Sequence, residues 1–331
     1  MKLACIGAGS WGTALAQLLA KNGNDVCVWA RKEQVVQSIN NQHKNPRYLS
    51  DVVLDEKISA STSYEVVLSG AQAVVVVTPS SIMRQVAADI APYVNAETPI
   101  IICSKGVEEQ SGMIGVEIFG ELLGNADRLA VLSGPNHAEE VILGIPSATV
   151  IAAYNENVAK KFQQIFASEN FRTYVSNDVS GVELCAAFKN VIAIAVGISY
   201  GLGFGDNTAA MIQTRGLAEM SRLVVACGGQ ALTCMGLAGA GDLVVTCMSK
   251  HSRNRRFGEM LASGNTLEDF SAETHMVAEG AYACKSLCVL AEKYNVELPI
   301  TKLVRSIVWE GEDAHNAAKI LRERPLNKEF Y

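Results

Sequence analysis

Lys189 lies in a segment that is almost entirely apolar, because only Asn190 accompanies it as a polar residue between Leu184 and Ile198. Burial in such a helix lowers the pKa of a lysine from about 10.4 toward the range useful for proton transfer. The same pattern fits a lysine whose stem lies along apolar surface while its amine reaches water. Lys189 is therefore a candidate general acid and base, and a snorkelling lysine is the alternative.

The motif GAGSWG at residues 7–12 follows a predicted strand and opens a predicted helix. At this spacing Gly7 permits the tight turn, Gly9 lets the backbone approach a pyrophosphate, and Gly12 lets the helix pack on the strand. The helix N-terminus offers free N–H groups and a positive dipole to the phosphates. The motif predicts a dinucleotide-binding site, and a glycine turn that serves only tight packing is the alternative.

The end of the second predicted strand bears on which dinucleotide binds. NAD sites usually carry Asp or Glu there to bind the ribose hydroxyls, whereas this strand ends in Trp29-Ala30 and is followed by Arg31. An arginine at this place suits the 2′-phosphate of NADP, although a solvated basic loop would look the same. Arg31 is predicted as a cofactor contact, and both NADP(H) and NAD(H) stay open.

Two polar segments come directly after predicted strands, at the sheet edge where open α/β sheets bind ligands. Ser104-Lys105-Gly106 follows Cys103, and the segment 134–138, which includes His137, follows Leu132. A histidine in such a segment is more often a satisfied surface residue than a ligand. These segments predict one edge of a binding site.

The densest basic cluster is the segment 250–256, KHSRNRR. A site for a phosphate or carboxylate fits this cluster better than a nucleic-acid surface, which would need more such patches with interleaved aromatic residues. A solvated helix face is the alternative.

Asp242 follows Gly239-Ala240-Gly241, which we interpret as a tight turn. A helix cap is the alternative to a functional carboxylate at this position.

Composition excludes several classes of protein. The 331 residues include 28 Lys and Arg and 34 Asp and Glu, a net charge of 28 − 34 = −6, which argues against nucleic-acid or anionic-membrane binding. The longest apolar run, 191–200, is shorter than the about 20 residues of a membrane-spanning helix. The nine cysteines form no C-x-x-C pair and no tight cluster with histidine, so we expect no metal site and a reducing, cytoplasmic location.

Hydrophobic periodicity changes character near residue 178. Before it, short apolar strands alternate with helical patterns, which predicts a Rossmann-like doubly wound parallel α/β sheet in a dinucleotide-binding domain, residues 1–178. After it, helical periodicity predicts a mostly α-helical substrate domain, residues 179–331. The predicted strands are 2–6, 25–29, 74–77, 99–103, 129–132, 148–153 and 171–175, and the predicted helices beyond residue 178 are 179–200, 206–227 and 278–294. The helical part offers room for a homodimer face, although it has no heptad pattern.

A series of segments occurs in one order along nearly the whole chain: GAGSWGTALA at 7–16, NPRYL at 45–49, SKG at 104–106, GP-x-HAEE at 134–140, ELCAAFKNVIAIAVG at 183–197, GLAGAGDL at 236–243, SRNRRFG at 252–258 and VAEG at 277–280. Together they resemble the bacterial-type NAD(P)-dependent glycerol-3-phosphate dehydrogenases. The resemblance implies reversible reduction of dihydroxyacetone phosphate to sn-glycerol 3-phosphate, which feeds phospholipid synthesis.

The resemblance also implies roles for individual residues. Lys189 matches the family's general acid and base. Substrate positions are matched by Lys105, Gly134, Asn136, Asp242, Ser252, Arg253 and Asn254, and Asn136 stands where the family commonly has Ser or Thr. Beside the glycines of the motif, cofactor positions are matched by Ser10, Trp11, Arg31, Tyr48, Lys105, Ala138, Arg253, Val277 and Glu279.

Two other functions stay open at this point. One is a hydroxy-acid dehydrogenase of the same two-domain architecture, which would need to bind a carboxylate in place of a phosphate. The other is a non-catalytic NADP-sensing module, which would bind cofactor without turnover and would leave Lys189 without a purpose.

Overall fold

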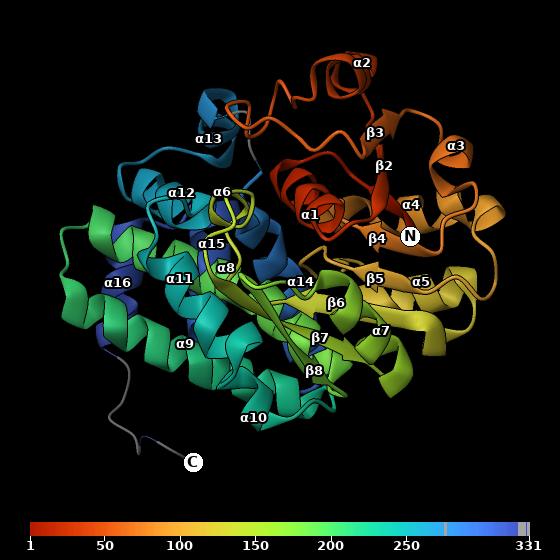
Figure 1. The fold of residues 1–331 in the computed structure, drawn as a ribbon. Helices are drawn as coiled ribbons and strands as arrows, with labels where there is room; N and C mark the ends of the chain where they lie inside the picture. The colour runs from red at the N-terminus through yellow and green to blue at the C-terminus, as the bar shows by residue number, and fades with distance from the viewer. Residues whose placement is uncertain (275–276, 324–328, 330–331) are drawn as a thin grey trace.

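A computed structural model describes residues 1–274, 277–323 and 329. One eight-stranded sheet forms the first part of the chain, and a group of helices packs beside it (Figure 1). The strand order is β3-β2-β1-β4-β5-β6-β7-β8. The strands are β1 Lys2–Ile6, β2 Asp25–Trp29, β3 Ile58–Ser61, β4 Ala73–Val76, β5 Ile100–Ile102, β6 Leu129–Ser133, β7 Ser147–Ala153 and β8 Phe171–Ser176.

The sheet is mostly parallel, as predicted, and its direction changes once, where β6 pairs with β7 in antiparallel register. The sequence predicted seven of these strands to within two residues at each end and missed β3. That strand has only four residues, ISAS, and lies at the edge of the sheet. A short polar edge strand leaves no continuous apolar run to detect.

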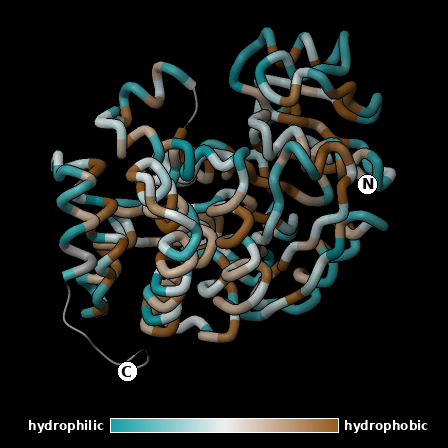
Figure 2. Tube along the Cα trace, turned by 90° about the vertical axis from the view of Figure 1, so that its left-hand side faces the viewer, coloured by the Kyte–Doolittle hydropathy of each residue, from teal (hydrophilic) through white to brown (hydrophobic). Residues whose placement is uncertain are grey.

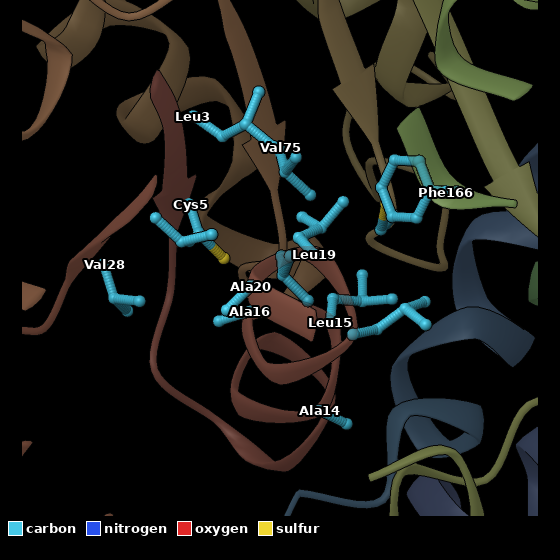
Figure 3. Packing of buried hydrophobic residues seen from close by; sticks show 14 of the residues in the cluster. Leu3, Cys5, Ala14, Leu15, Ala16, Leu19, Ala20, Val28, Val75 and Phe166 are labelled. Carbon is cyan, nitrogen blue, oxygen red and sulfur yellow. The ribbon is translucent and has the colours of Figure 1, made fainter. Parts of the chain in front are cut away.

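Both faces of the sheet are covered, because alternate side chains of a strand point to opposite sides. On one face Cys5 and Val75 pack with the apolar side of α1 (Ser10–Lys21) and with Phe166 of α7 (Glu156–Phe166), as Figure 3 shows. On the other face Ile6 and Val76 pack with α4 (Met83–Ile90) and α5 (Gly115–Leu123). Three further α-helices belong to this part, α2 Glu33–Gln42, α3 Tyr64–Leu68 and α6 Ala138–Val141, together with short 3-10 helices at Ser80–Ile82, Ala91–Tyr93 and Ala126–Arg128.

From residue 179 onward the described chain contains helices and no strand. The helices are α8 Val179–Gly201, α9 Asp206–Ala226, α10 Ala231–Cys234, α11 Asp242–Met248, α12 Arg253–Ala262, α13 Leu267–Thr274, α14 Glu279–Lys293, α15 Pro299–Trp309 and α16 Ala314–Arg322. The outer ones carry hydrophilic and hydrophobic segments in turn (Figure 2), as expected of helices that bury one face. The tight turn predicted at Gly239-Ala240-Gly241 is instead the end of a π-helical turn, Leu237–Gly241, which leads directly into α11.

Helix α8 is the core of this helical part and packs against α9, α11, α12 and α14. By length and composition two stretches, Val179–Gly201 and Ala231–Met248, could cross a membrane, but the apolar window of α8 is buried within the fold and the second stretch is broken into separate helices. Helices α8 and α12 approach unusually closely. A Cβ on Gly197 would lie 2.0 Å from the Arg255 carbonyl oxygen, so only glycine permits the contact. This contact brings the start of α12 toward Lys189.

Candidate active site

Lys189 and Asp242 form a buried ion pair at the centre of the predicted site. The Nζ of Lys189 lies 2.5 Å from Asp242 Oδ1 and donates to Thr246 Oγ1 at 3.0 Å, and Asp242 is 1% exposed. The other oxygen, Oδ2, accepts from Lys105 Nζ at 2.7 Å. The snorkelling alternative for Lys189 is therefore wrong. The carboxylate of Asp242 does not cap the helix that it begins, since it binds the two lysines and Thr246.

Three different parts of the fold deliver these groups. Lys189 lies in the middle of α8, a helix whose first turn is capped by Asp178, which accepts from Gly181 N at 2.9 Å. Asp242 is the first residue of α11, directly after the π-helical turn. Lys105 follows β5 in the sheet. The site therefore joins the carboxyl edge of the sheet to the helical core.

Burial and neighbouring charges set the pKa values of this group. Burial lowers the pKa of Lys189 to about 8, even though Asp242 favours the charged amine. Burial raises the pKa of Asp242, but Lys105 and Lys189 outweigh it and hold that pKa below its usual value. An amine that titrates near neutrality, fixed beside a carboxylate that stays ionised, is suited to giving and taking a proton.

The segment after β6 lies beside this group. Lys105 Nζ is 3.4 Å from the carbonyl oxygen of Gly134. Gly134 itself lies so close to β7 that a Cβ at this position would fall 2.8 Å from Thr149 Cα. The amide nitrogen of Asn136 donates to the carbonyl oxygens of Pro135 and Ala148, both at 3.0 Å. Its oxygen is buried without a partner. Asn136 therefore has an acceptor to offer a ligand, and its two donors are used.

The basic cluster predicted as an anion site divides into buried and exposed members. Ser252 is buried and caps α12 by accepting from Arg255 N at 3.2 Å. Asn254 is also buried, where it donates to Asn190 Oδ1 at 2.9 Å and accepts from Gly280 N at 3.0 Å. Arg253 is exposed, and within the described residues it makes no side-chain hydrogen bond or ion pair. The start of α12 thus has a free guanidinium beside open helix N–H groups.

The glycine motif has the geometry that a dinucleotide needs. Gly7 has a φ of +126°, and a Cβ there would lie 2.4 Å from the Val77 carbonyl oxygen. A Cβ on Gly12 would lie 2.0 Å from the Gly7 carbonyl oxygen, so the turn is closed on that side. A Cβ on Gly9 would meet nothing within 4 Å, and α1 begins at Ser10 without a side-chain cap. The indole N–H of Trp11 is buried without a partner. These residues fit a bound dinucleotide pyrophosphate.

The other predicted cofactor residues lie around this motif at various depths. Arg31 follows β2, is exposed, and has no ion pair among the described residues. The loop that contains Tyr48 is tied to the motif by Asn45, which accepts from Tyr48 N at 3.2 Å and donates to the Ala8 carbonyl oxygen at 2.9 Å. Ala138 begins α6 and is buried.

At the far end of the chain, Val277 is 44% exposed and Glu279 begins α14. Burial raises the pKa of Glu279 above its usual value, and the positive charges of Arg253, Lys105 and Lys189 oppose that rise, so this carboxyl lies within electrostatic reach of the site. No hydrogen bond in the described part of the chain links Arg31, Tyr48 or Val277 to the Lys189 group.

Three positioning side chains of this site were not predicted from the sequence. Thr246 stands one helical turn after Asp242, and that spacing could have indicated it. Asn190 was noted only as a polar residue beside Lys189, and it holds Asn254. Glu183 is buried on α8 and accepts from Gly115 N at 2.9 Å and Val116 N at 3.1 Å, the first two N–H groups of α5. Only the tertiary structure shows that contact.

Comparison with known proteins covers both parts of this arrangement. The N-terminal region of NAD-dependent glycerol-3-phosphate dehydrogenase matches residues 2–159, and its C-terminal region matches residues 178–319. The chain belongs to the NAD-dependent glycerol-3-phosphate dehydrogenase family. A glycerol-3-phosphate dehydrogenase [NAD(P)+] from Clostridium perfringens is 41% identical over 328 residues, which cover 99% of each chain. One from Enterococcus faecalis is 43% identical over 335 residues, which cover 99% of this chain and 98% of the relative.

Solved structures of the glycerol-3-phosphate dehydrogenase family support the architecture. The enzyme from Coxiella burnetii has a TM-score of 0.94 and 37% sequence identity, and the match covers 98% of this chain and 99% of that one. D-mandelate dehydrogenase, at 14% identity and a TM-score of 0.64, shares the fold alone. The Rossmann-like sheet followed by a helical part, predicted from the sequence, is therefore confirmed.

Proposed function

We propose that this chain catalyses the reversible reduction of dihydroxyacetone phosphate to sn-glycerol 3-phosphate with NADPH or NADH, and so supplies phospholipid synthesis. The observation that carries the proposal is the buried Lys189–Asp242 pair, with its amine of pKa about 8, in a chain that matches the dehydrogenase family over nearly its whole length. We also propose residues 1–178 as the cofactor domain and residues 179–331 as the substrate domain.

The bound nicotinamide supplies the hydride in the reductive direction and accepts it in the oxidative one. Negative charge develops on the carbonyl oxygen as the ketone is reduced, and protonated Lys189 stabilises that oxygen and donates its proton. In the reverse direction neutral Lys189 takes the proton from the hydroxyl. Asp242 keeps the amine in place at 2.5 Å, and Lys105 adds positive charge on its other side at 2.7 Å.

The substrate phosphate is proposed to bind at the start of α12. The guanidinium of Arg253 matches phosphate oxygens in a two-pronged contact, and the helix N-terminus adds N–H groups and a positive dipole. Ser252 and Asn254 are fixed there by contacts of their own, and each retains a donor for the ligand. Gly134 and Lys105 border the same place. Asn136 is proposed to accept a hydrogen bond from a substrate hydroxyl through its unpartnered oxygen.

The cofactor is proposed to lie across the glycine motif, with its pyrophosphate at Gly9, Ser10 and the start of α1. The free Arg31 favours a 2′-phosphate, hence NADP(H), while NAD(H) uses the same cradle. Ala138 and Glu279 would border the nicotinamide half, beside the Lys189 group, with Arg253 between the two ligands. Tyr48 and Val277 are proposed cofactor contacts on the family resemblance alone.

Two further proposals concern the protein in the cell. The nine cysteines are free thiols, and eight of them are buried, which suits a reducing cytoplasm. A homodimer stays a prediction of the sequence, and sedimentation of the purified protein would test it.

The experiment that tests the function follows the loss of reduced-nicotinamide absorbance. Purified protein is mixed with dihydroxyacetone phosphate and either NADPH or NADH, with unphosphorylated dihydroxyacetone and a small keto acid as controls. We expect rapid turnover only with the phosphorylated ketone. Turnover on the keto acid would favour a hydroxy-acid dehydrogenase, and cofactor binding without turnover on any substrate would favour a sensing module.

A further inference from the structure

Two of the nine cysteines face each other inside the helical part of the molecule. The Sγ atoms of Cys185 on α8 and Cys234 on α10 lie 3.7 Å apart, and both side chains are fully buried. Among the described residues this is the one cysteine pair joined by a sulfur–sulfur hydrogen bond. A disulfide has sulfurs about 2.0 Å apart, so closing this pair requires an approach of roughly 1.7 Å.

The two helices that carry these cysteines are fastened to each other at one point. Asp178, which caps α8, also accepts from Gln230 N at 2.9 Å and from Thr233 Oγ1 at 2.5 Å, immediately before Cys234. The sulfurs are therefore held in apposition by a network that does not depend on them. A redox-active pair needs such apposition, because the second sulfur must attack before the first is oxidised further.

The two thiols are also unequal in acidity. The hydrogen bond from Cys185 lowers the pKa of Cys234, while the same bond and burial raise the pKa of Cys185. Cys234 is therefore the thiol that ionises first, and thiolates are the species that oxidants attack. Its helix has only four residues, and the adjacent Leu232 and Met235 are 79% and 65% exposed. A single turn at the surface opens more easily than the core beneath it, which gives a small oxidant access.

Both cysteines are mechanically connected to the Lys189–Asp242 pair. Cys185 precedes Lys189 by one turn of α8. The backbone of Cys234 presses on the π-helical turn, because a Cβ on Gly239 would lie 2.1 Å from the Cys234 carbonyl oxygen. That turn ends at Gly241, next to Asp242. A backbone shift at either cysteine would therefore reach one member of the ion pair.

We propose that hydrogen peroxide converts Cys185 and Cys234 into a reversible disulfide that switches off the Lys189–Asp242 site. The Cys234 thiolate attacks one peroxide oxygen, and the other oxygen leaves as water once protonated. The sulfur of Cys185 then attacks the Cys234 sulfenic acid, forms the S–S bond and releases a second water. Two thiols and one peroxide thus become one disulfide and two waters, and a dithiol reductant reverses the change.

The switch of activity rests on the proposed function. Detection of the disulfide does not, so it is tested separately. The full-length protein is treated with peroxide, and its intact mass and its peptides are measured under non-reducing conditions. We expect a loss of two hydrogens and a peptide pair that joins Cys185 to Cys234, both removed by dithiothreitol. Absence of that peptide pair would overturn the proposal, whether or not the protein reduces dihydroxyacetone phosphate.

The functional half follows the reduction of dihydroxyacetone phosphate before and after oxidation. Because a displacement of about 1 Å in an active site can cost on the order of 100-fold in rate, we expect at least a tenfold fall in kcat/KM that dithiothreitol restores. Cys234→Ser should keep its activity under peroxide. Cys284→Ser is the matched control, since Cys284 is equally buried on α14 and donates to the Ala281 carbonyl oxygen, and it should respond like the unaltered chain. A disulfide that forms without loss of activity, or equal inactivation of Cys234→Ser, would refute the switch.

Discussion

The region proposed to transfer the proton and the region proposed to bind phosphate groups are built in opposite ways. Lys189, Asp242 and Lys105 are buried or nearly so and already paired with one another. Arg31 and Arg253 are exposed and make no ion pair within the part of the chain that the structure describes. A buried charge must have its partner in the folded state, since an unpaired one is very costly. An exposed arginine, by contrast, is stabilised by water until an anion binds. The buried group is thus already ion-paired in the folded protein, whereas the exposed arginines would gain their partners only from a ligand.

The largest expected effect comes from replacing Lys189 in the buried ion-paired group. Lys189→Ala removes the proposed proton donor, so we expect kcat to fall at least about 100-fold while the Kd of the cofactor stays unchanged. Steady-state kinetics and a fluorescence titration with NADPH measure the two quantities. Lys189→Met, which keeps the volume of the stem, should lose as much. Near-normal turnover in either variant would remove Lys189 from the mechanism.

A smaller effect is expected from replacing Arg253, one of the two exposed arginines. Arg253→Ala removes charge-assisted hydrogen bonds worth about 1.5–3 kcal/mol each, so the KM for dihydroxyacetone phosphate should rise about 10- to 100-fold. Arg256→Ala is the matched control, because Arg256 lies on the same helix but is paired with Glu273. An equal rise of KM in both variants would mean that general surface charge, and not Arg253, attracts the phosphate.

The titration of Lys189 sharpens the comparison, because it should make the proposed proton transfer depend on pH near neutrality. The amine is protonated below its pKa of about 8. Ketone reduction needs the protonated form, so its kcat should fall about tenfold per pH unit above that value, and alcohol oxidation should fall likewise below it. Rates in both directions between roughly pH 6 and 10 test this. Profiles that bend in the same direction would contradict the assignment.

The smallest effect concerns the choice between cofactors. Arg31→Ala should weaken the binding of NADPH by about tenfold, because one charge-assisted contact is lost. The affinity for NADH should stay nearly unchanged. Lys32→Ala, the exposed neighbour, should change neither. If Arg31→Ala weakens both cofactors equally, the arginine does not read the 2′-phosphate.

Local signals in the sequence were sufficient for most of the fold. The apolar strands, the GAGSWG turn and the change to helical periodicity near residue 178 are each readable within a short window. The antiparallel pairing of β7 with β6 and the existence of β3 were not readable, since both depend on which strands meet in space. The direction of a strand within its sheet is a tertiary property.

The site was predictable to the extent that a residue looked out of place in its own segment. Lys189 stood out in an apolar run, and the structure shows it buried and paired. Asp242 could not be told from a cap, because its partners Lys105 and Lys189 are 137 and 53 positions away in sequence. Glu183 gave no local signal at all. The catalytic and binding roles of these residues stay predictions until the variants are measured.

The carboxylate of Glu183 has a consequence for the order in which this molecule is completed. During synthesis all eight strands and α5 precede residue 183. Helix α5 must therefore form while its first N–H groups lack the buried acceptor that they have in the finished protein. They obtain it only when α8 docks, and α8 is also the helix that carries Lys189. The start of α5 therefore lacks its acceptor until α8 docks, and the step that supplies the acceptor is the same step that brings Lys189 to the sheet.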